Sequence, residues 1–128
     1  MKILSVKQPW ADAILRMGKD VENRTWTTDY RGKIYIHASK TIDYDAPPLL
    51  FGVDPLTLGK ILGYVTLTEV IRNSSSRWAM SGQYHWIIES PVKFNHFIPA
   101  RGQLGLWTPS DELIKKIEYE ESLIDLNF

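Results

Sequence analysis

The chain contains no cysteine, which excludes disulfide bonds and thiolate metal sites. It has only three histidines and no His-x-x-x-His pair, so we expect no metal and no other cofactor. Neither G-x-x-x-x-G-K-[ST] nor G-x-G-x-x-G occurs, which leaves nucleoside-triphosphate and Rossmann chemistry unsupported. No long apolar run follows the N-terminus, so we predict no signal peptide and no membrane span. We therefore expect a cytoplasmic protein.

An excess of charge of one sign is also missing, because 15 lysines and arginines balance 15 acidic residues. The charges are nevertheless distributed unevenly. Residues 109–128 hold six acids and two lysines, a net of −4, so residues 1–108 hold 13 bases and 9 acids, a net of +4. This mild basicity is far below that of proteins that bind duplex DNA. Any binding of nucleic acid should therefore depend on stacking and pocket contacts more than on bulk charge.

The distribution of apolar, proline and glycine residues predicts a small mixed fold. A helix should follow Pro9 and stop at Gly18, and a second should begin near Pro109, capped by Ser110 or Thr108. Strands are predicted over residues 2–6, 22–26, 33–38, 60–70, 84–89, 92–98 and after Gly105, and residues 39–59 should form a loop with at most a short helix. We predict one α+β domain over residues 1–128, a closed or nearly closed β-barrel of five to six strands with two to three peripheral helices.

The segment Lys19-Asp20-Val21-Glu22-Asn23-Arg24 gathers cations, carboxylates and an amide within six residues. In a strand, Glu22, Arg24 and Trp26 would share one face, with Val21 and Asn23 on the other. Such a face can hold a polar planar ligand, or it can be an ordinary salt bridge. Lys19 would have to lose its proton to act as a nucleophile or base, which Glu22 opposes because a nearby anion favours the ammonium.

Other residues extend the candidate site. Trp10 could stack on a base, but its helical spacing with Ala13 and Ile14 also suits a core tryptophan. Gln8, at the start of the same helix, suits recognition. Trp86 and Trp107 lie in apolar strands and are predicted to be core residues. A second basic set could follow a nucleic-acid backbone or form a solvated strand face, and comprises Arg31, Lys33, His37 and Lys40. At the edges of the cleft we expect Tyr30, Arg31, His37, Ser39 and Lys40.

Five spaced motifs together resemble ASCH domains (activating signal cointegrator homology). They are Leu4-Ser5-Val6-Lys7-Gln8-Pro9-Trp10-Ala11, Lys19-x-x-Glu22-x-Arg24-x-Trp26, Tyr30-Arg31-Gly32 with Ile36-His37-Ala38-Ser39-Lys40, Tyr84-His85-Trp86, and Gly102-x-x-Gly105-Leu106-Trp107. The chain departs from the family signature at one position. The signature has glycine two residues before the lysine, where this chain has Met17, and Gly18 comes one residue later.

The resemblance implies a PUA-like barrel whose cleft, lined by Lys19, Glu22 and Arg24, binds RNA or a modified nucleobase. An alternative is a small hydrolase acting on a modified nucleoside or RNA through Lys19 and Glu22. Family members that resemble amidohydrolases use a lysine, a threonine and a glutamate. Here Glu22 occupies the threonine position, and Glu69 is the nearest substitute for the glutamate. A third hypothesis is a protein-interaction module whose acidic C-terminal helix, over residues 111–126, binds a partner.

Overall fold

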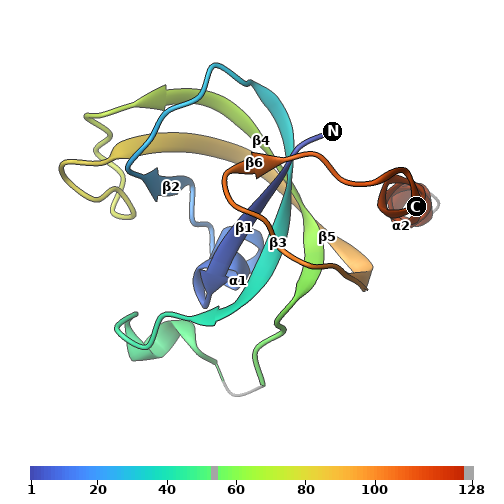
Figure 1. The fold of residues 1–128 in the computed structure, drawn as a ribbon. Helices are drawn as coiled ribbons and strands as arrows, with labels where there is room; N and C mark the ends of the chain where they lie inside the picture. Colours follow the sequence, from blue (N-terminus) through green and yellow to red (C-terminus); the bar gives the residue numbers. More distant parts are fainter. Residues whose placement is uncertain (53–54, 126–128) are drawn as a thin grey trace.

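The structure, a computed structural model, describes residues 1–52 and 55–125. Six strands form one sheet in the order β2-β5-β4-β3-β1-β6, which curls into a half-barrel (Figure 1). The helical elements are α1 (Trp10–Arg16), the short 3₁₀ helix η1 (Pro48–Leu50) and α2 (Asp111–Asp125). The strands are β1 (Ile3–Gln8), β2 (Val21–Arg24), β3 (Gly32–Ile42), β4 (Lys60–Ile71), β5 (Tyr84–Pro99) and β6 (Leu106–Trp107). The predicted α+β barrel is confirmed.

The curl brings the two ends of the sheet together. Strands β1 and β3 pair in parallel, and every other neighbouring pair in the sheet is antiparallel. Arg24 on the edge strand β2 donates a hydrogen bond of 3.0 Å from Nη2 to the carbonyl oxygen of Ser5 on β1. Strands β2 and β1 lie far apart in the sheet order, so this side chain connects the two sides of the half-barrel opening.

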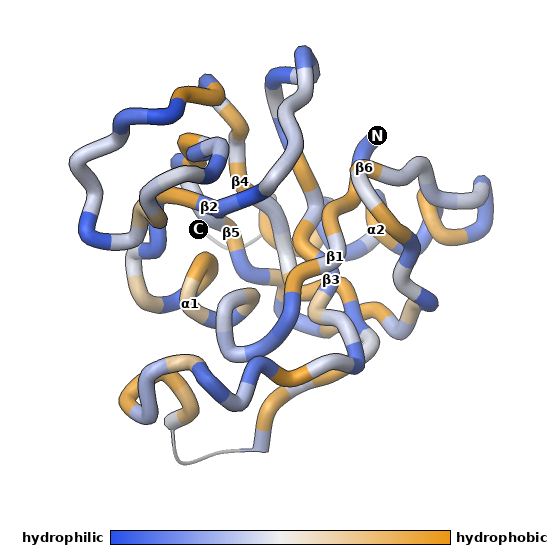
Figure 2. The backbone as a smooth tube through the Cα atoms, turned by 60° about the vertical axis from the view of Figure 1, so that its left-hand side comes forward, coloured by the Kyte–Doolittle hydropathy of each residue, from blue (hydrophilic) through white to orange (hydrophobic). Residues whose placement is uncertain are grey.

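The interior of the curl is filled by one face of the strands and by α1. Alternation along β3 places Ile34, Ile36 and Ala38 in this core, with Trp86 of β5 fully buried among them. The buried residues Ala11 and Ile14 are the contribution of α1. Figure 2 shows hydrophobic segments in the strands, while the connecting loops contain both hydrophilic and hydrophobic stretches.

A second core covers the other face of the sheet beneath α2, which lies to the right in Figure 1. Ile117 of α2 is fully buried against Tyr35, Phe94 and Ile98 of the strands, and Trp107 is 5% exposed in the same cluster. The prediction that Trp86 and Trp107 are core residues is confirmed. The Leu113 amide donates to Ser110 Oγ at 3.2 Å, so Ser110 is the helix cap.

Strand β5 differs from its predicted form. The sequence predicted two strands broken at Pro91, yet Tyr84–Pro99 is one strand along its whole length. The register shifts between Tyr64 and Thr66 of β4, which pair with Val92 and Glu89, so Ser90 and Pro91 form a bulge. Ser90 takes a positive φ of 53°, and the missing amide proton of Pro91 falls where the ladder is already interrupted. Proline therefore bends this strand without ending it.

The predicted loop over residues 39–59 is shorter than expected. Strand β3 continues to Ile42 because its last residues still pair with β1, where Ile42 lies opposite Gln8. The short helix η1 follows within the remaining loop, as predicted. Within residues 1–52 and 55–125, no helix has the length and apolarity needed to span a membrane.

Candidate functional site

The turn after α1 places Lys19 in the interior of the half-barrel. The helix ends at Arg16, and Gly18 takes a φ of +72°, a conformation that glycine adopts without steric cost. The chain then turns, and the Lys19 amide donates to the carbonyl oxygen of Ala13 at 3.2 Å. Gly18 therefore stops the helix as predicted. Lys19 follows the turn directly and is 4% exposed.

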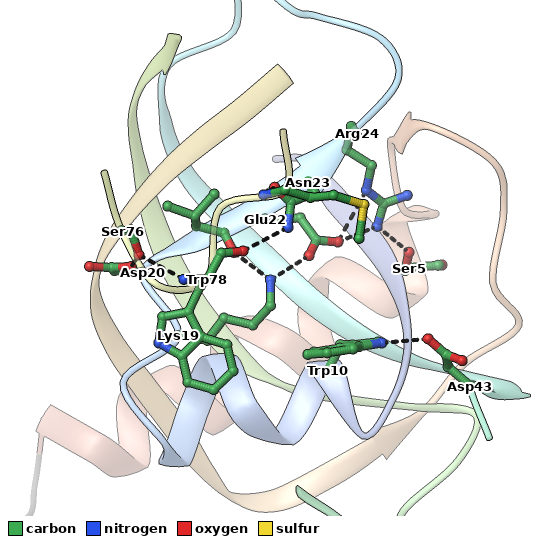
Figure 3. Close-up of polar contacts among 12 residues, drawn as sticks. Ser5, Trp10, Lys19, Asp20, Glu22, Asn23, Arg24, Asp43, Ser76 and Trp78 are labelled. Carbon is green, nitrogen blue, oxygen red and sulfur yellow. Dashed lines mark hydrogen bonds and ion pairs between the residues drawn. The ribbon is translucent and has the colours of Figure 1, made fainter. Parts of the chain in front are cut away.

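Lys19, Glu22 and Arg24 form a compact ion cluster, which we call the signature triad (Figure 3). Lys19 Nζ donates to Glu22 Oε1 at 2.9 Å and also to the carbonyl oxygen of Val21. Arg24 donates to Glu22 Oε2 from Nη2 at 2.8 Å and from Nε at 3.1 Å. Each carboxylate oxygen therefore binds one cation, and alternation along β2 places Glu22 and Arg24 on the same face, as predicted.

The electrostatics of the triad favour a charged carboxylate. Burial by itself raises the pKa of Glu22, but the nearby charges and hydrogen bonds of Lys19 and Arg24 outweigh burial and hold the pKa below its ordinary value. With Glu22 ionised, the two cations and one anion leave one positive charge. The Arg24 side chain is 22% exposed, so part of that charge reaches the solvent.

The triad lies at one side of a pocket of about 570 Å³, which we call the signature cleft. Two tryptophans line it together with the triad. Trp10 donates from Nε1 to Asp43 Oδ2 at 2.9 Å, and Lys19 Nζ lies 5.7 Å from the centre of its ring. Trp26 packs edge-on against Trp86 with ring centres 4.7 Å apart. Both rings also contact the core inside the curl of the sheet, so each tryptophan packs against the core and also lines the cleft.

A second pocket of about 990 Å³, the side compartment, adjoins the signature cleft. Both cavities are lined by Ser5, Ser39, Gln103 and Leu104, so the segment between β5 and β6 borders both. Lys40 and Arg101 line the side compartment but not the signature cleft, and both are exposed.

A buried hydrogen-bond chain holds both ends of that bordering segment. Trp107 Nε1 donates to Ser5 Oγ at 3.2 Å, Ser5 Oγ lies 3.0 Å from His37 Nδ1, and His37 Nε2 lies 2.7 Å from the carbonyl oxygen of Ala100. The carbonyl of Ala100 can only accept, so Nε2 carries the ring proton and Nδ1 accepts from the Ser5 hydroxyl. Burial lowers the pKa of His37, opposed by the bond to Ala100.

The structure distributes the ten predicted site residues over three places. Five line the signature cleft, namely Trp10, Lys19, Glu22, Arg24 and Ser39. His37 and Lys40 line the side compartment, with Ser39 shared between the two. Gln8, Tyr30 and Arg31 line neither cavity.

Gln8 is fully buried, and its amide is occupied by the helix that follows. Its Nε2 donates to Asp12 Oδ1 at 3.1 Å and to the carbonyl oxygen of Thr57 at 2.9 Å, and its Oε1 accepts from the Asp12 amide at 3.0 Å. The structure therefore gives Gln8 a structural position. Tyr30 donates to the carbonyl oxygen of Lys33 and Arg31 donates to that of Thr28, so both support the local turn.

Sequence reasoning missed the residues that border the cavities from loops. Met80 and Leu104 line the signature cleft and are 54% and 99% exposed. Asn23 also lines it, although its amide holds the neighbouring loop through the carbonyl of Trp78 and the amide of Met80. Leu104 and Arg101 lie within or beside the last of the five family motifs, Gly102-x-x-Gly105-Leu106-Trp107, but the motif itself indicated a loop and gave neither residue a role.

Glu69, the substitute considered for a catalytic glutamate, is exposed on β4 and lines neither cavity. Among the described residues, no group of three or more histidine, aspartate or glutamate side chains is arranged to hold a metal ion.

The curled sheet and its flanking helices agree with the predicted PUA-like barrel fold. The family model described as "ASCH domain" matches residues 4–119, and the chain therefore belongs to the ASCH domain family.

Two further comparisons agree with this assignment. A 36-residue segment is 50% identical to human activating signal cointegrator 1, a match that covers 28% of this chain and only 6% of that protein. A crystal structure of a mutant form of ZmASCH from Zymomonas mobilis superposes with a TM-score of 0.63, covering 92% of this chain and 96% of that one. At 15% sequence identity, this second match supports the fold alone.

Proposed function

We propose that the signature cleft binds a nucleobase-containing ligand, with single-stranded RNA as the first candidate. The observation that carries this proposal is the signature triad lying beside two tryptophans in one cavity. Aromatic side chains stack on bases of any identity, whereas charged and amide groups can bond to base edges. Membership of the ASCH domain family supports the same class of ligand.

The polarity of the cleft suits a planar ring more than a highly charged group. Glu22 accepts from both cations of the triad, so only one net positive charge remains there to attract an anion. The partly exposed Arg24 guanidinium retains donors that can reach a base oxygen or ring nitrogen. A base lying between the walls of the cleft would thus meet donors at its edge and an aromatic surface at its face.

The contacts of Lys19 favour binding over hydrolysis. A lysine nucleophile must present a free amine, yet Nζ donates to both Glu22 and the carbonyl oxygen of Val21. The Lys19 side chain is 2% exposed, which also limits its access to a substrate. Turnover of a modified nucleoside by Lys19 and Glu22 would require these bonds to break first.

The experiment is fluorescence polarisation of a labelled single-stranded RNA with the wild type and three variants. Trp10→Ala should weaken binding by ~1–3 kcal/mol, the range for loss of one stacking aromatic. Arg24→Lys keeps the charge but removes the planar fork of donors, so it should also weaken binding. Arg31→Lys is the matched control, because Arg31 is exposed and lines neither cavity.

Equal affinity of all four proteins for RNA would overturn the proposal that the signature cleft is the binding site. Incubation with RNA, followed by separation of the products, distinguishes binding from hydrolysis. Cleavage that Glu22→Gln abolishes, in a variant that remains folded, would favour the hydrolase hypothesis instead.

A further inference from the structure

We propose that the side compartment binds a phosphate group of the same ligand, so that the protein recognises nucleotides in preference to free nucleosides. This inference rests on the proposed function, since it extends the ligand from the signature cleft into the neighbouring cavity. The shared chemistry is a phosphate attached to a nucleoside, and its source is either a single-stranded backbone or a mononucleotide.

The first argument is that the two cavities are neighbours. Ser5, Ser39 and Leu104 line both of them, so one ligand can contact both cavities over these residues. The side compartment has a volume of about 990 Å³, which is larger than a phosphate group alone requires. Leu104 is 99% exposed at this boundary and presents an apolar surface between the two parts of the ligand.

The second argument is the contrast in charge between the cavities. The cations of the signature triad share one carboxylate, whereas no aspartate or glutamate among the described residues lines the side compartment. Lys40 and Arg101 line it, and neither forms an ion pair with any residue in the described parts of the chain. Two exposed cations that form no ion pair within the described residues favour an anion, and phosphate contacts of this kind position a nucleic acid.

The third argument is that packing holds the side-chain stem of Lys40 and the backbone segment that carries Arg101 in place. The stem of Lys40 packs over Gly59, where an added Cβ would lie 3.2 Å from Lys40 Cε, so the absence of a side chain there gives the lysine its place. Arg101 directly follows Ala100, whose carbonyl oxygen is bound by His37 Nε2 at 2.7 Å. An added Cβ on Gly102 would lie 2.8 Å from His37 Cε1, so the segment packs closely on the buried hydrogen-bond chain.

The experiment measures three ligands of increasing phosphate content: a nucleoside, its 5′-monophosphate and a short single-stranded RNA. Calorimetry gives the affinity of the first two, and fluorescence polarisation at several salt concentrations gives that of the RNA. The variants are Lys40→Gln, Arg101→Gln and the two combined. Lys93→Gln and Arg16→Gln are matched controls, because both residues are exposed and line neither cavity.

The slope of log K for RNA binding against log[salt] should become about 0.7 less steep for each phosphate contact that is lost. At low salt, this change weakens the affinity for RNA roughly eightfold. Nucleoside affinity should remain unchanged in the same variants. Equal sensitivity of the monophosphate would identify a nucleotide as sufficient, and sensitivity of RNA alone would identify the backbone. Both results support a phosphate site.

One result would overturn the phosphate inference and leave the proposed function standing. In that result, RNA binding depends on Trp10, but the salt slope is the same for the controls and for the double variant Lys40→Gln, Arg101→Gln. Failure of the wild type to bind any of the three ligands would instead overturn the proposed function. Circular dichroism confirms that each variant is folded, which is expected because both side chains are exposed.

Discussion

Glu22 is the residue on which the signature triad depends. Its two oxygens accept from Lys19 and Arg24 at 2.9 Å and 2.8 Å, and its side chain is 9% exposed. Buried ion pairs add little net stability, since desolvation opposes the attraction, but removing one partner leaves an uncompensated charge. The Glu22 carboxylate therefore holds the side chains of Lys19 and Arg24 in place beside the signature cleft.

We predict that Glu22→Gln lowers the free energy of unfolding by about 3–5 kcal/mol, the range for breaking a buried ion pair. Lys19 and Arg24 would then face each other without a counter-charge. Urea denaturation at neutral pH measures the change. Glu69→Gln is the control, since Glu69 is exposed and its loss should change stability by no more than about 0.5 kcal/mol. A Glu22→Gln variant as stable as this control would show that the triad is not coupled to folding.

The same carboxylate predicts a pH dependence. The folded-state pKa of Glu22 lies below its ordinary value of 4.5, so its contribution to stability is present above that pH and is lost as pH falls through the folded pKa. The difference in unfolding free energy between wild type and Glu22→Gln should therefore shrink on acidification from about pH 6 to about pH 3. A difference that stays constant over this interval would contradict the proposed charge state.

His37 predicts a second pH dependence at higher pH. Burial lowers its folded-state pKa below the ordinary value of 6.5, so the neutral ring contributes stability above that pH, which is lost as pH falls through the folded pKa. Wild type should lose more stability than His37→Gln as pH decreases below 6.5. Parallel pH profiles of the two proteins, measured by urea denaturation, would disprove this role.

At the scale of elements, close contacts between backbones fix the curl of the sheet. Gly63 on β4 lies opposite Lys93 of β5, close to the bulge at Ser90 and Pro91, and an added Cβ would meet the carbonyl oxygen of Val92 at 2.0 Å. No side chain fits there without moving a strand. Bulges re-aim strands locally, and this one lets β5 continue beyond Pro91 while the sheet bends.

We predict that Gly63→Ala destabilises the fold by more than about 4 kcal/mol, a range associated with steric conflict in a core. Gly82→Ala is the matched control, because Gly82 has a positive φ, of 86°, but an added Cβ there meets nothing within 4 Å. The control should cost about 1–2 kcal/mol for its backbone conformation alone. Thermal denaturation followed by circular dichroism separates the two, and equal losses would contradict the steric explanation.

The apolar face of α2 packs against the sheet of its own domain. Ile117 is fully buried on the sheet, and Glu121 pairs with Lys33 of β3 at 2.9 Å and also accepts from Tyr35. We predict that Ile117→Ala costs about 2–5 kcal/mol of unfolding free energy while RNA affinity stays unchanged under conditions where the protein is folded. Any protein partner of this helix would therefore contact its exposed side, where three acids and two lysines among the described residues are exposed.

Elements were predictable where one local rule decided them. Alternation along β3 and the Gly18 stop after α1 both agree with the sequence pattern. Strand β5 was predicted incorrectly because a local rule, that proline ends a strand, was overridden by pairing with β4, which sequence alone does not show. The continuation of β3 to Ile42 has the same cause, since its partner β1 lies far away in the sequence.

At the scale of the whole molecule, the candidate site combines elements that are distant in sequence. The Lys19–Arg24 segment could be identified because its polar residues are adjacent in one short stretch. The side compartment could not, since Lys40 and Arg101 are brought together only when β3 and the end of β5 both reach β4. The place of Gln8 could not be predicted either, because a buried amide that caps a helix has the same sequence signal as one that recognises a ligand.

The most direct test of the central claim is to titrate single-stranded RNA into ¹⁵N-labelled protein and follow the five tryptophan indole signals by NMR. We predict that the indole N–H signals of Trp10 and Trp26 shift progressively, together with Arg24 Nε–H, while the signals of α2 remain in place. Shifts confined to α2, or an absence of any shift near the signature triad at saturating RNA, would contradict the claim that this cleft binds nucleobases.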